Sequence, residues 1–165
     1  MSPAPHLVLR EMTEEEWGEL RRFIVRDYAD AQVRAGSWDE DEALRRAETQ
    51  MEEMMPEGRA TQGKLLLSAD NGDGERVGSL WLSIDERPSG PRGESWINYI
   101  EISAPFRGKG YGRALLSAAE ETARAHGLRS IGLNVFAENT VARRLYDSAG
   151  FDVVTTWMRK SLEAT

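Results

Sequence analysis

The chain contains no cysteine among its 165 residues, which excludes a disulfide framework, a thiolate zinc site and a cysteine nucleophile. It also has no run of about eighteen consecutive apolar residues, so we expect no membrane span. The first residues lack a basic region followed by an apolar core, so we expect no secretory signal. Together these absences favour a cytoplasmic protein.

Basic residues are in the minority. The chain carries 21 Lys and Arg against 28 Asp and Glu, a net charge of −7, which argues against a nucleic-acid-binding protein. Residues 11–53 hold 14 acids and 6 bases, whereas residues 104–165 hold 6 acids and 9 bases. This asymmetry would suit two ligands of opposite charge, although solvated helix faces are the simpler explanation and need no ligand.

The spacing of apolar residues predicts a single α/β domain over residues 1–165, with element order βααβββαβαβ. The expected fold is a central mixed sheet of about six strands flanked by helices. Capping-box patterns begin the first two helices, at Thr13 and at Ser37. The predicted strands are 6–10, 64–69, 77–84, 96–103, 131–136 and 151–160, and the predicted helices are 13–36, 37–55, 112–126 and 139–149. The segment 96–135 is a candidate βαβ crossover whose parallel pairing the pattern leaves open.

A glycine-rich turn lies between a predicted strand and a predicted helix, with the sequence Arg107-Gly108-Lys109-Gly110-Tyr111-Gly112. Its glycines allow the backbone to approach a ligand closely, and the N–H groups at the start of a helix attract anions. Arg107, Lys109 and Arg113 add positive charge. The turn therefore predicts a phosphate or pyrophosphate cradle, although it fits neither a Walker loop nor the dinucleotide-binding fingerprint.

This segment resembles the acetyl-CoA motif of the GCN5-related N-acetyltransferase (GNAT) family. The family pattern is Gln or Arg, two residues, Gly, one residue, then Gly or Ala, and here Arg107, Gly110 and Gly112 fill it. A second family signature is matched in the right order by Asn139, Ala142, Leu145, Tyr146, Gly150 and Phe151. The resemblance implies a GNAT-like fold, with an acetyl-CoA-binding core over about 96–151.

The resemblance also implies how acetyl-CoA is held. The backbone of Ile100 and Ile102 would pair with the pantetheine arm, and the main-chain N–H groups of residues 108–112 would hold the pyrophosphate. Both expectations agree with the affinity of extended amides for open strand edges and of anions for helix N-termini. The cofactor-binding residues so predicted are Ile100, Ile102, Arg107, Gly108, Lys109, Gly110, Tyr111, Gly112, Arg113, Asn139, Ala142 and Tyr146.

The implied activity is acetyl-CoA-dependent N-acetyltransfer, by direct attack of a primary amine on the thioester in a ternary complex without a metal. By analogy with the family, Tyr146 is the general acid that protonates the leaving thiolate. A phenol with a pKa of about 10 suits a thiol with a pKa of about 8.5. The amine must first lose a proton, and Glu101 is the candidate base. Strand alternation places Glu101 on the face opposite Ile100 and Ile102, toward either the acceptor cleft or water.

The sequence signal for the acceptor-binding site is less specific than the signal for the cofactor site. In the family the first two helices wall this site, and here Tyr28 and Trp38 lie among carboxylates, which suits a small cationic amine. A core tryptophan beside capping acids explains the same residues. Trp81 and Tyr99, on central strands, are either core or cleft lining. The chain after Phe151 is too short for the C-terminal hairpin of many relatives, so the cleft is either open there or closed by a second subunit in a homodimer.

Two other functions stay open on the sequence. One is acetylation of a protein N-terminus or lysine instead of a small amine. The other is a regulatory domain that binds CoA without turnover. The presence of Tyr146, and of a strand that would bind the pantetheine arm, favours an enzyme over a regulatory domain.

Overall fold

The computed structural model describes residues 5–85 and 90–162. The chain forms two compact units, Met1–Asn134 and Val135–Thr165. Their boundary falls within the predicted cofactor-binding range 96–151, and a single domain over 1–165 stays a prediction. None of the helices in the described ranges is both long and apolar enough to cross a membrane.

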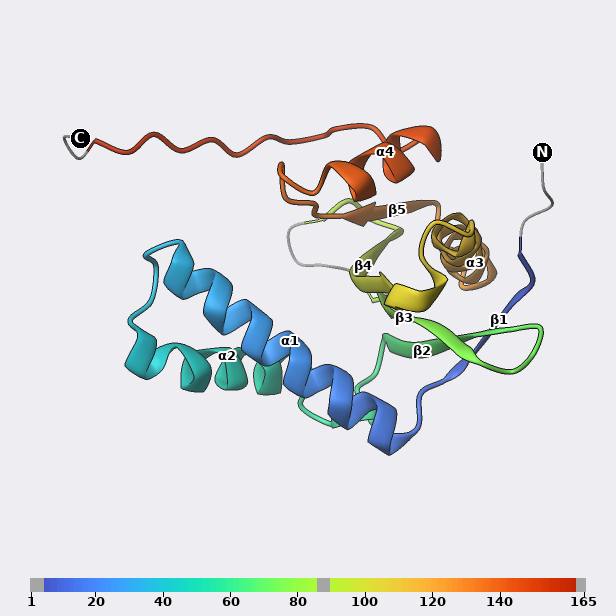
Figure 1. Cartoon of the computed structure of the whole chain (residues 1–165), viewed down its shortest axis with the longest axis horizontal. Coiled ribbons are helices and arrows are strands. Elements are labelled where there is room, and N and C mark those ends of the chain that lie inside the picture. Colours follow the sequence, from blue (N-terminus) through green and yellow to red (C-terminus); the bar gives the residue numbers. More distant parts are fainter. Residues whose placement is uncertain (1–4, 86–89, 163–165) are drawn as a thin grey trace. The chain divides into compact units, whose positions relative to one another are not determined.

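The first unit contains a five-stranded sheet in the order β1-β2-β3-β4-β5 (Figure 1). Strands β1 to β4 are antiparallel, and β5 is parallel to β4, so the crossover over 96–135 is a parallel βαβ unit. The sheet is therefore mixed, as predicted. The strands are β1 Leu7–Glu11, β2 Lys64–Asn71, β3 Arg76–Ser83, β4 Glu94–Ile102 and β5 Ser130–Leu133.

Helices cover both faces of this sheet. Helices α1 (Glu14–Arg34) and α2 (Glu40–Met54) lie on one face, and α3 (Tyr111–Ala125) lies on the other (Figure 1). The capping box predicted for α1 is present, since the Thr13 side chain accepts from the Glu16 N–H and the Glu16 carboxylate accepts from the Thr13 N–H. The capping box predicted for α2 is wrong, because Asp39 is the N-cap and makes no side-chain cap bond. Two 3₁₀ turns, η1 Gly58–Ala60 and η2 Ala104–Phe106, complete the unit.

Each face of the sheet has its own core. Trp17 of α1 meets Trp81 of β3 edge-on, with ring centroids 5.9 Å apart, inside a cluster shared with α2. On the other face, buried Leu115 and Leu116 of α3 pack against the sheet. The contact there is close at Gly78 of β3, where a Cβ atom would lie 3.3 Å from Leu115 Cδ2 of α3. Both helix layers are thus held at close range to β3 and β4.

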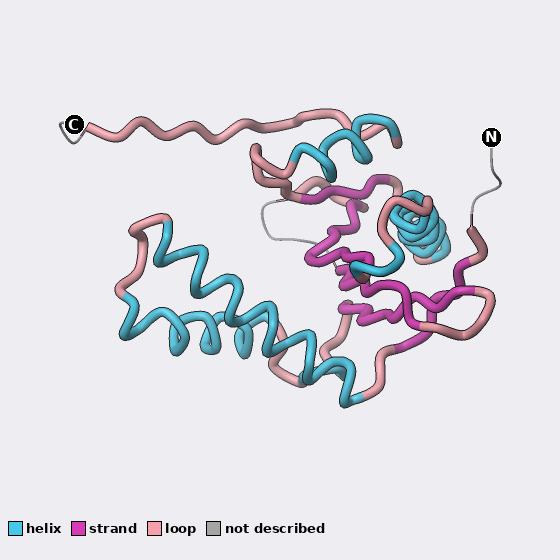
Figure 2. The backbone as a smooth tube through the Cα atoms, viewed as in Figure 1, coloured by secondary structure: helices cyan, strands magenta, loops and turns pink. Residues whose placement is uncertain are grey.

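The second unit contains α4 (Thr140–Ser148), which begins where the Asn139 side chain accepts from the Ala142 N–H at 3.1 Å. Residues 151–162 form neither helix nor strand (Figure 2). The strand predicted over 151–160 is therefore wrong for this chain, and the sheet has five strands where about six were predicted. The β-branched residues there have strand propensity, but a strand also needs a partner edge for its N–H and C=O groups.

Candidate functional site

Strand β4 has an open edge in its second half. It pairs with β5 only over Glu94–Ile97. The β3–β4 register shifts at the same place, leaving Asn98 as an extra residue on β4, and its amide donates to Ser83 Oγ at 2.6 Å. Such a bulge bends a strand and interrupts regular pairing. Within the described residues, nothing pairs with 98–102 on the β5 side.

The main-chain groups along this edge point in a defined direction. The Ser103 N–H donates to Val77 O of β3 at 2.9 Å. In an antiparallel ladder the direction alternates, so the backbone of Glu101 also faces β3, and the backbone groups of Ile100 and Ile102 face away from it. The Ile102 oxygen accepts from Arg107 Nε at 2.8 Å, as this orientation requires.

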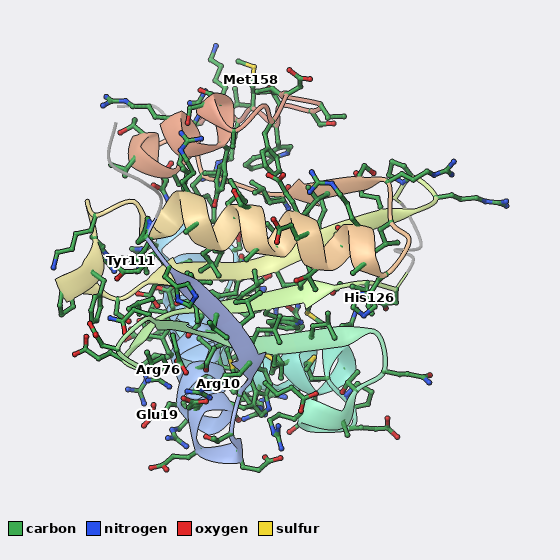
Figure 3. All side chains as sticks on the ribbon, turned by 90° about the vertical axis from the view of Figure 1, so that its right-hand side faces the viewer. Arg10, Glu19, Arg76, Tyr111, His126 and Met158 are labelled. Atoms are coloured by element: carbon green, nitrogen blue, oxygen red, sulfur yellow. The ribbon has the colours of Figure 1, made fainter. Side chains whose placement is uncertain are left out.

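The glycine-rich turn follows directly. Gly108 and Gly110 have left-handed backbones, with φ of 72° and 88°. Gly110 is the N-cap of α3, and the Ala114 N–H donates to its oxygen at 3.1 Å. The main-chain N–H groups that precede Ala114 lie outside the helical ladder, at the positive end of the helix dipole. Tyr111 marks this end of α3 in Figure 3, and His126 marks the other. A Cβ atom on Gly108 would meet nothing within 4 Å, so there is open space at this residue, whereas a Cβ on Gly110 would lie 3.2 Å from the Pro5 side chain.

The charged side chains of the turn have different surroundings. Lys109 Nζ lies 5.8 Å from the centre of the Phe106 ring, and that ring contacts Tyr111 edge-on at 6.0 Å. Arg107 turns back to β4, where it donates to Ile102 O and pairs with Glu101 Oε1 at 3.2 Å. Positive charge thus flanks the turn, and Arg107 links it to the strand.

Glu101 is the centre of a small polar network. The Tyr99 hydroxyl donates to Glu101 Oε2 at 2.5 Å, and Arg107 pairs with the other oxygen. Burial, and then the Glu101 carboxylate, raise the pKa of Tyr99 far above its ordinary value. Tyr99 therefore stays protonated and cannot be a base. An ionised carboxylate has about four lone-pair sites, so Glu101 can hold both donors at once.

The two faces of β4 contact different helices. The Tyr99 ring meets Phe23 of α1 edge-on at 6.3 Å, so Tyr99 and Glu101 face α1. A Cβ on Gly78 would meet both Ile102 and Leu115, at 2.9 and 3.3 Å, so Ile102 faces α3. Asp27 of α1 also contributes to the raised pKa of Tyr99.

Sequence reasoning missed Phe23 and Asp27 as neighbours of the network. Their i, i+4 spacing on α1 places them on one helix face, and this was the available signal.

The other predicted acceptor residues lie elsewhere. Tyr28 and Trp38 contact each other edge-on at 5.4 Å, but Arg46 of α2 already lies over the Trp38 ring at 5.9 Å. A hollow of about 330 Å³ beside Trp38 is lined by Arg45, Arg46, Thr49, Gln50 and Glu53. Its two arginines disfavour a cation. Trp81 is 2% exposed and belongs to the core, and its buried indole N–H has no hydrogen-bond partner among the residues that the structure describes.

In the second unit, Ala142 and Tyr146 lie four residues apart on one face of α4, and Asn139 is the N-cap of the same helix. The Asn139 amide oxygen caps the helix. The Tyr146 ring lies 5.6 Å from that of Phe151, and burial raises the pKa of Tyr146. The phenol is thus protonated at neutral pH, as a proton donor must be. Over residues 5–85 and 90–162, no three His, Asp or Glu side chains are grouped as a metal site requires.

The family model described as "Acetyltransferase (GNAT) family" matches residues 9–151. The chain is 36% identical to the uncharacterized N-acetyltransferase YdgE of Bacillus subtilis over 154 residues, which are 93% of this chain and 97% of that protein. The crystal structure of the B. subtilis acetyltransferase YycN superposes with a TM-score of 0.84 at 32% identity, covering 96% of this chain and 99% of the other. The aminoglycoside acetyltransferase AAC(6')-Iy, solved with a bisubstrate analogue of CoA, shares the fold at 16% identity, with a TM-score of 0.58 over 96% of each chain or more. The chain belongs to the GNAT family of acetyltransferases.

Proposed function

We propose that the protein transfers an acetyl group from acetyl-CoA to a primary amine, by direct attack in a ternary complex. The observation that supports this most is the succession of the outward-facing Ile100–Ile102 edge and the open turn at the start of α3. CoA combines an extended arm that carries amides with a pyrophosphate, and the chain offers a strand edge and then an anion cradle in the same order.

In this proposal the main chain of residues 108–112 holds the pyrophosphate, and Lys109 and Arg113 add positive charge. Bound acetyl-CoA supplies the thioester that the amine attacks. The open space at Gly108 fits a bulky anion. The Arg107 guanidinium now donates to Ile102 O, an atom that the pantetheine arm would use. Binding of the arm therefore displaces Arg107 from that oxygen.

Tyr146 is the proposed acid. Its raised pKa keeps the phenol protonated at neutral pH. The thiolate of CoA is a weaker base than the phenolate, so the phenol acts by donating a hydrogen bond to the departing sulfur and passing the proton as the C–S bond breaks. Asn139 fixes the first turn of the same helix through its cap. Ala142, small and on the Tyr146 face, leaves that face accessible.

Glu101 is the proposed base, acting directly or through a water molecule. The acceptor is proposed to be a small cationic amine, since Phe23, Asp27, Tyr99 and Glu101 combine aromatic rings and carboxylates on the α1 side of β4. This group supports amine binding better than the Tyr28–Trp38 pair does, because Arg46 occupies the cation–π position on Trp38. AAC(6')-Iy, solved with an acetylneamine conjugate of CoA, acts as a precedent for such an acceptor on this fold.

The test is thiol release from acetyl-CoA with a panel of polyamines, aminoglycosides, and peptides with a free N-terminus or lysine. We expect turnover with small cationic amines and a loss of at least about 100-fold in kcat for Tyr146→Phe, with CoA affinity unchanged. Full activity of Tyr146→Phe would remove the acid assignment. Turnover with peptides alone would indicate a protein acetyltransferase, and firm CoA binding without turnover would indicate a regulatory domain.

Two further expectations accompany this function. The reaction should need no metal, so turnover should survive dialysis against a chelator. The cytoplasmic location that the lack of cysteine favours stays a prediction, which fractionation of cells would test.

A further inference from the structure

Asn98 is an extra residue in the ladder between β3 and β4. Ile97 lies opposite Leu82 of β3. Tyr99 lies opposite Trp81, the preceding residue of β3, so Asn98 forms the bulge between them. Bulges are common beside active sites, where they turn a side chain in a direction that regular alternation does not give. The bulge follows Ile97, the last residue of β4 that pairs with β5.

The Asn98 amide group is held in one orientation. Its nitrogen donates to Ser83 Oγ at 2.6 Å and to Trp96 O at 3.4 Å. The main-chain oxygen of Trp96 can only accept, so the nitrogen of the amide, and not its oxygen, lies on this side. Ser83 is 2% exposed and is itself fixed by Lys64 Nζ at 3.1 Å, which pairs with Asp85 at 2.7 Å. Both amide hydrogens of Asn98 are thus used within the protein.

Among the described residues, no donor reaches the amide oxygen of Asn98. The two hydrogen bonds of this side chain within residues 5–85 and 90–162 are those made by its nitrogen, and the oxygen can accept up to two. The side chain is half-buried, and the buried side-chain atom that lacks a partner in these ranges is Trp81 Nε1, so solvent reaches Asn98 Oδ1. An acceptor atom with a fixed direction is therefore available to a ligand.

The Asn98 amide lies on the face of the sheet where the acceptor amine is proposed to bind. Ser83 is two residues from Trp81 on β3, so the two side chains share a face. The Trp81 ring meets Trp17 of α1, which makes this the α1 face. The amide held by Ser83 is consequently on the α1 side of β4, beside Tyr99.

The place of Asn98 along β4 also matches the reacting end of the cofactor. This step rests on the function proposed above, in which residues 108–112 hold the pyrophosphate and the edge from Ile102 to Ile100 pairs with the pantetheine arm. Asn98 lies four residues before Ile102, about 13 Å back along the strand and farther from the turn. It is therefore at the end of the edge where the acyl group is expected.

We propose that Asn98 Oδ1 binds the attacking amine by accepting one of its N–H groups, and that this bond selects primary amines. A neutral primary amine has two N–H groups and one lone pair. With one N–H on Oδ1, the other hydrogen goes to the base while the lone pair forms the N–C bond. The C–S bond breaks with its electron pair on sulfur, and the sulfur takes a proton, so protons and electrons balance.

The amide suits this task better than a carboxylate does. A carboxylate would stabilise the ammonium form of the acceptor, which has no lone pair, whereas the neutral Asn98 oxygen favours that form less. An N-methyl amine has a single N–H in its neutral form. It cannot serve both Oδ1 and the base, so it should be a poor acceptor.

The first test compares three acceptors: the primary amine with the highest turnover, its N-methyl derivative, and the isomer with the methyl group on the adjacent carbon. The isomer is the steric control, because it keeps both N–H groups. Wild type should prefer the parent over the N-methyl derivative by about tenfold in kcat/KM, and the isomer should rank above the N-methyl derivative. In Asn98→Ala this preference should fall below about threefold. Equal use of the parent and the N-methyl amine by wild type, or an intact preference in Asn98→Ala, would overturn the proposal.

The second test measures binding without turnover, by calorimetric titration of the parent amine into the protein saturated with CoA. Asn98→Ala should weaken amine binding about tenfold and leave CoA affinity unchanged. Ser83→Ala keeps Asn98 but removes an acceptor that fixes its amide, so a loss of about threefold is expected. Ser95→Ala is the matched control, because Ser95 is also buried and bonds to Ser130 O at 3.1 Å, but lies on the other face of β4. It should bind the amine as wild type does.

The outcomes separate this role from the proposed function. Wild type that turns over amines, with unchanged amine affinity in Asn98→Ala, would remove the role of Asn98 and leave the acetyltransferase. An equal loss of amine and CoA affinity in Asn98→Ala would show that Asn98 shapes the edge of β4 instead of binding the amine. Firm CoA binding without thiol release for any amine would overturn both.

Discussion

Replacing Glu16 with Gln should measure how firmly α1 is joined to the sheet. The Glu16 carboxylate accepts from both terminal nitrogens of Arg10 at 2.8 Å, from the Thr13 N–H at 2.9 Å and from Ser68 Oγ at 3.0 Å. Arg76 lies at 3.3 Å, and Figure 3 shows it close to Arg10. These bonds, the Arg10 bonds above all, lower the pKa of Glu16 to about 2. Glutamine keeps the shape, but its amide nitrogen cannot accept a hydrogen bond from Arg10, so the substitution removes the charge and at least one of the Arg10 bonds.

The size of the effect follows from the pKa. A change in the pKa of Glu16 from 4.5 in the unfolded chain to about 2 in the folded one, at about 1.4 kcal/mol per pKa unit, corresponds to about 3 kcal/mol of stability. The Arg10 side chain is 39% exposed, and solvent screening reduces this to about 2 kcal/mol. Because the folded-state pKa is the lower one, the contribution is complete above about pH 4.5. It is lost as the pH falls through about 2, with less than half remaining at pH 3.

Urea unfolding at pH 7 and pH 3 provides the measurement. Glu16→Gln should lower the free energy of unfolding by about 2 kcal/mol at pH 7, and the gap from wild type should shrink by at least half at pH 3. Glu19→Gln is the matched control on the same helix, since Glu19 is half exposed and pairs with Arg76 at the longer distance of 3.5 Å. We expect it to change stability by less than about 0.5 kcal/mol. Equal costs for the two variants at pH 7, or a gap that does not narrow at pH 3, would refute the reasoning.

Two further variants test the packing of β5 and the Glu101 network. Gly132→Ala places a Cβ about 2.6 Å from the Trp96 ring and should lower the free energy of unfolding by about 2 kcal/mol. Gly18→Ala, on an uncrowded helix face, is the control and should not destabilise the protein. Equal melting temperatures for the two variants would contradict the close contact at Gly132. Tyr99→Phe removes the hydroxyl that donates to Glu101 Oε2 and should lower kcat/KM for a cationic amine about tenfold. The affinity for CoA, measured by calorimetry, should be unchanged. A loss of CoA affinity would instead place Tyr99 on the cofactor side.

The elements that the sequence predicted well depend on local chemistry. Each of these features depends on a few neighbouring residues: the capping box of Thr13 and Glu16, the glycine turn before α3 and the glycine after the end of α3. The order of elements as far as α4 follows from the same kind of signal.

What the sequence could not predict depends on partners distant in the chain. The bulge at Asn98 changes the alternation along β4, so counting from Trp96 does not tell which face Glu101 occupies. The core position of Trp81 depends on Trp17, which lies 64 residues earlier. The strand predicted over 151–160 had the right propensity, but a strand also needs a partner edge, and within residues 5–85 and 90–162 this segment forms no ladder.

Calorimetric titration of CoA into Gly108→Asp tests the central claim, that the turn before α3 holds the pyrophosphate of CoA. Gly127→Asp is the control, since both glycines have left-handed backbones, with φ of 72° and 78°, and a Cβ on either meets nothing within 4 Å. The two variants therefore have the same backbone strain, but only the substitution at Gly108 places a carboxylate in the cradle. We predict that Gly108→Asp weakens CoA binding at least about tenfold, or about 1.4 kcal/mol, and that Gly127→Asp binds as wild type does. Undiminished CoA affinity in Gly108→Asp would contradict the account.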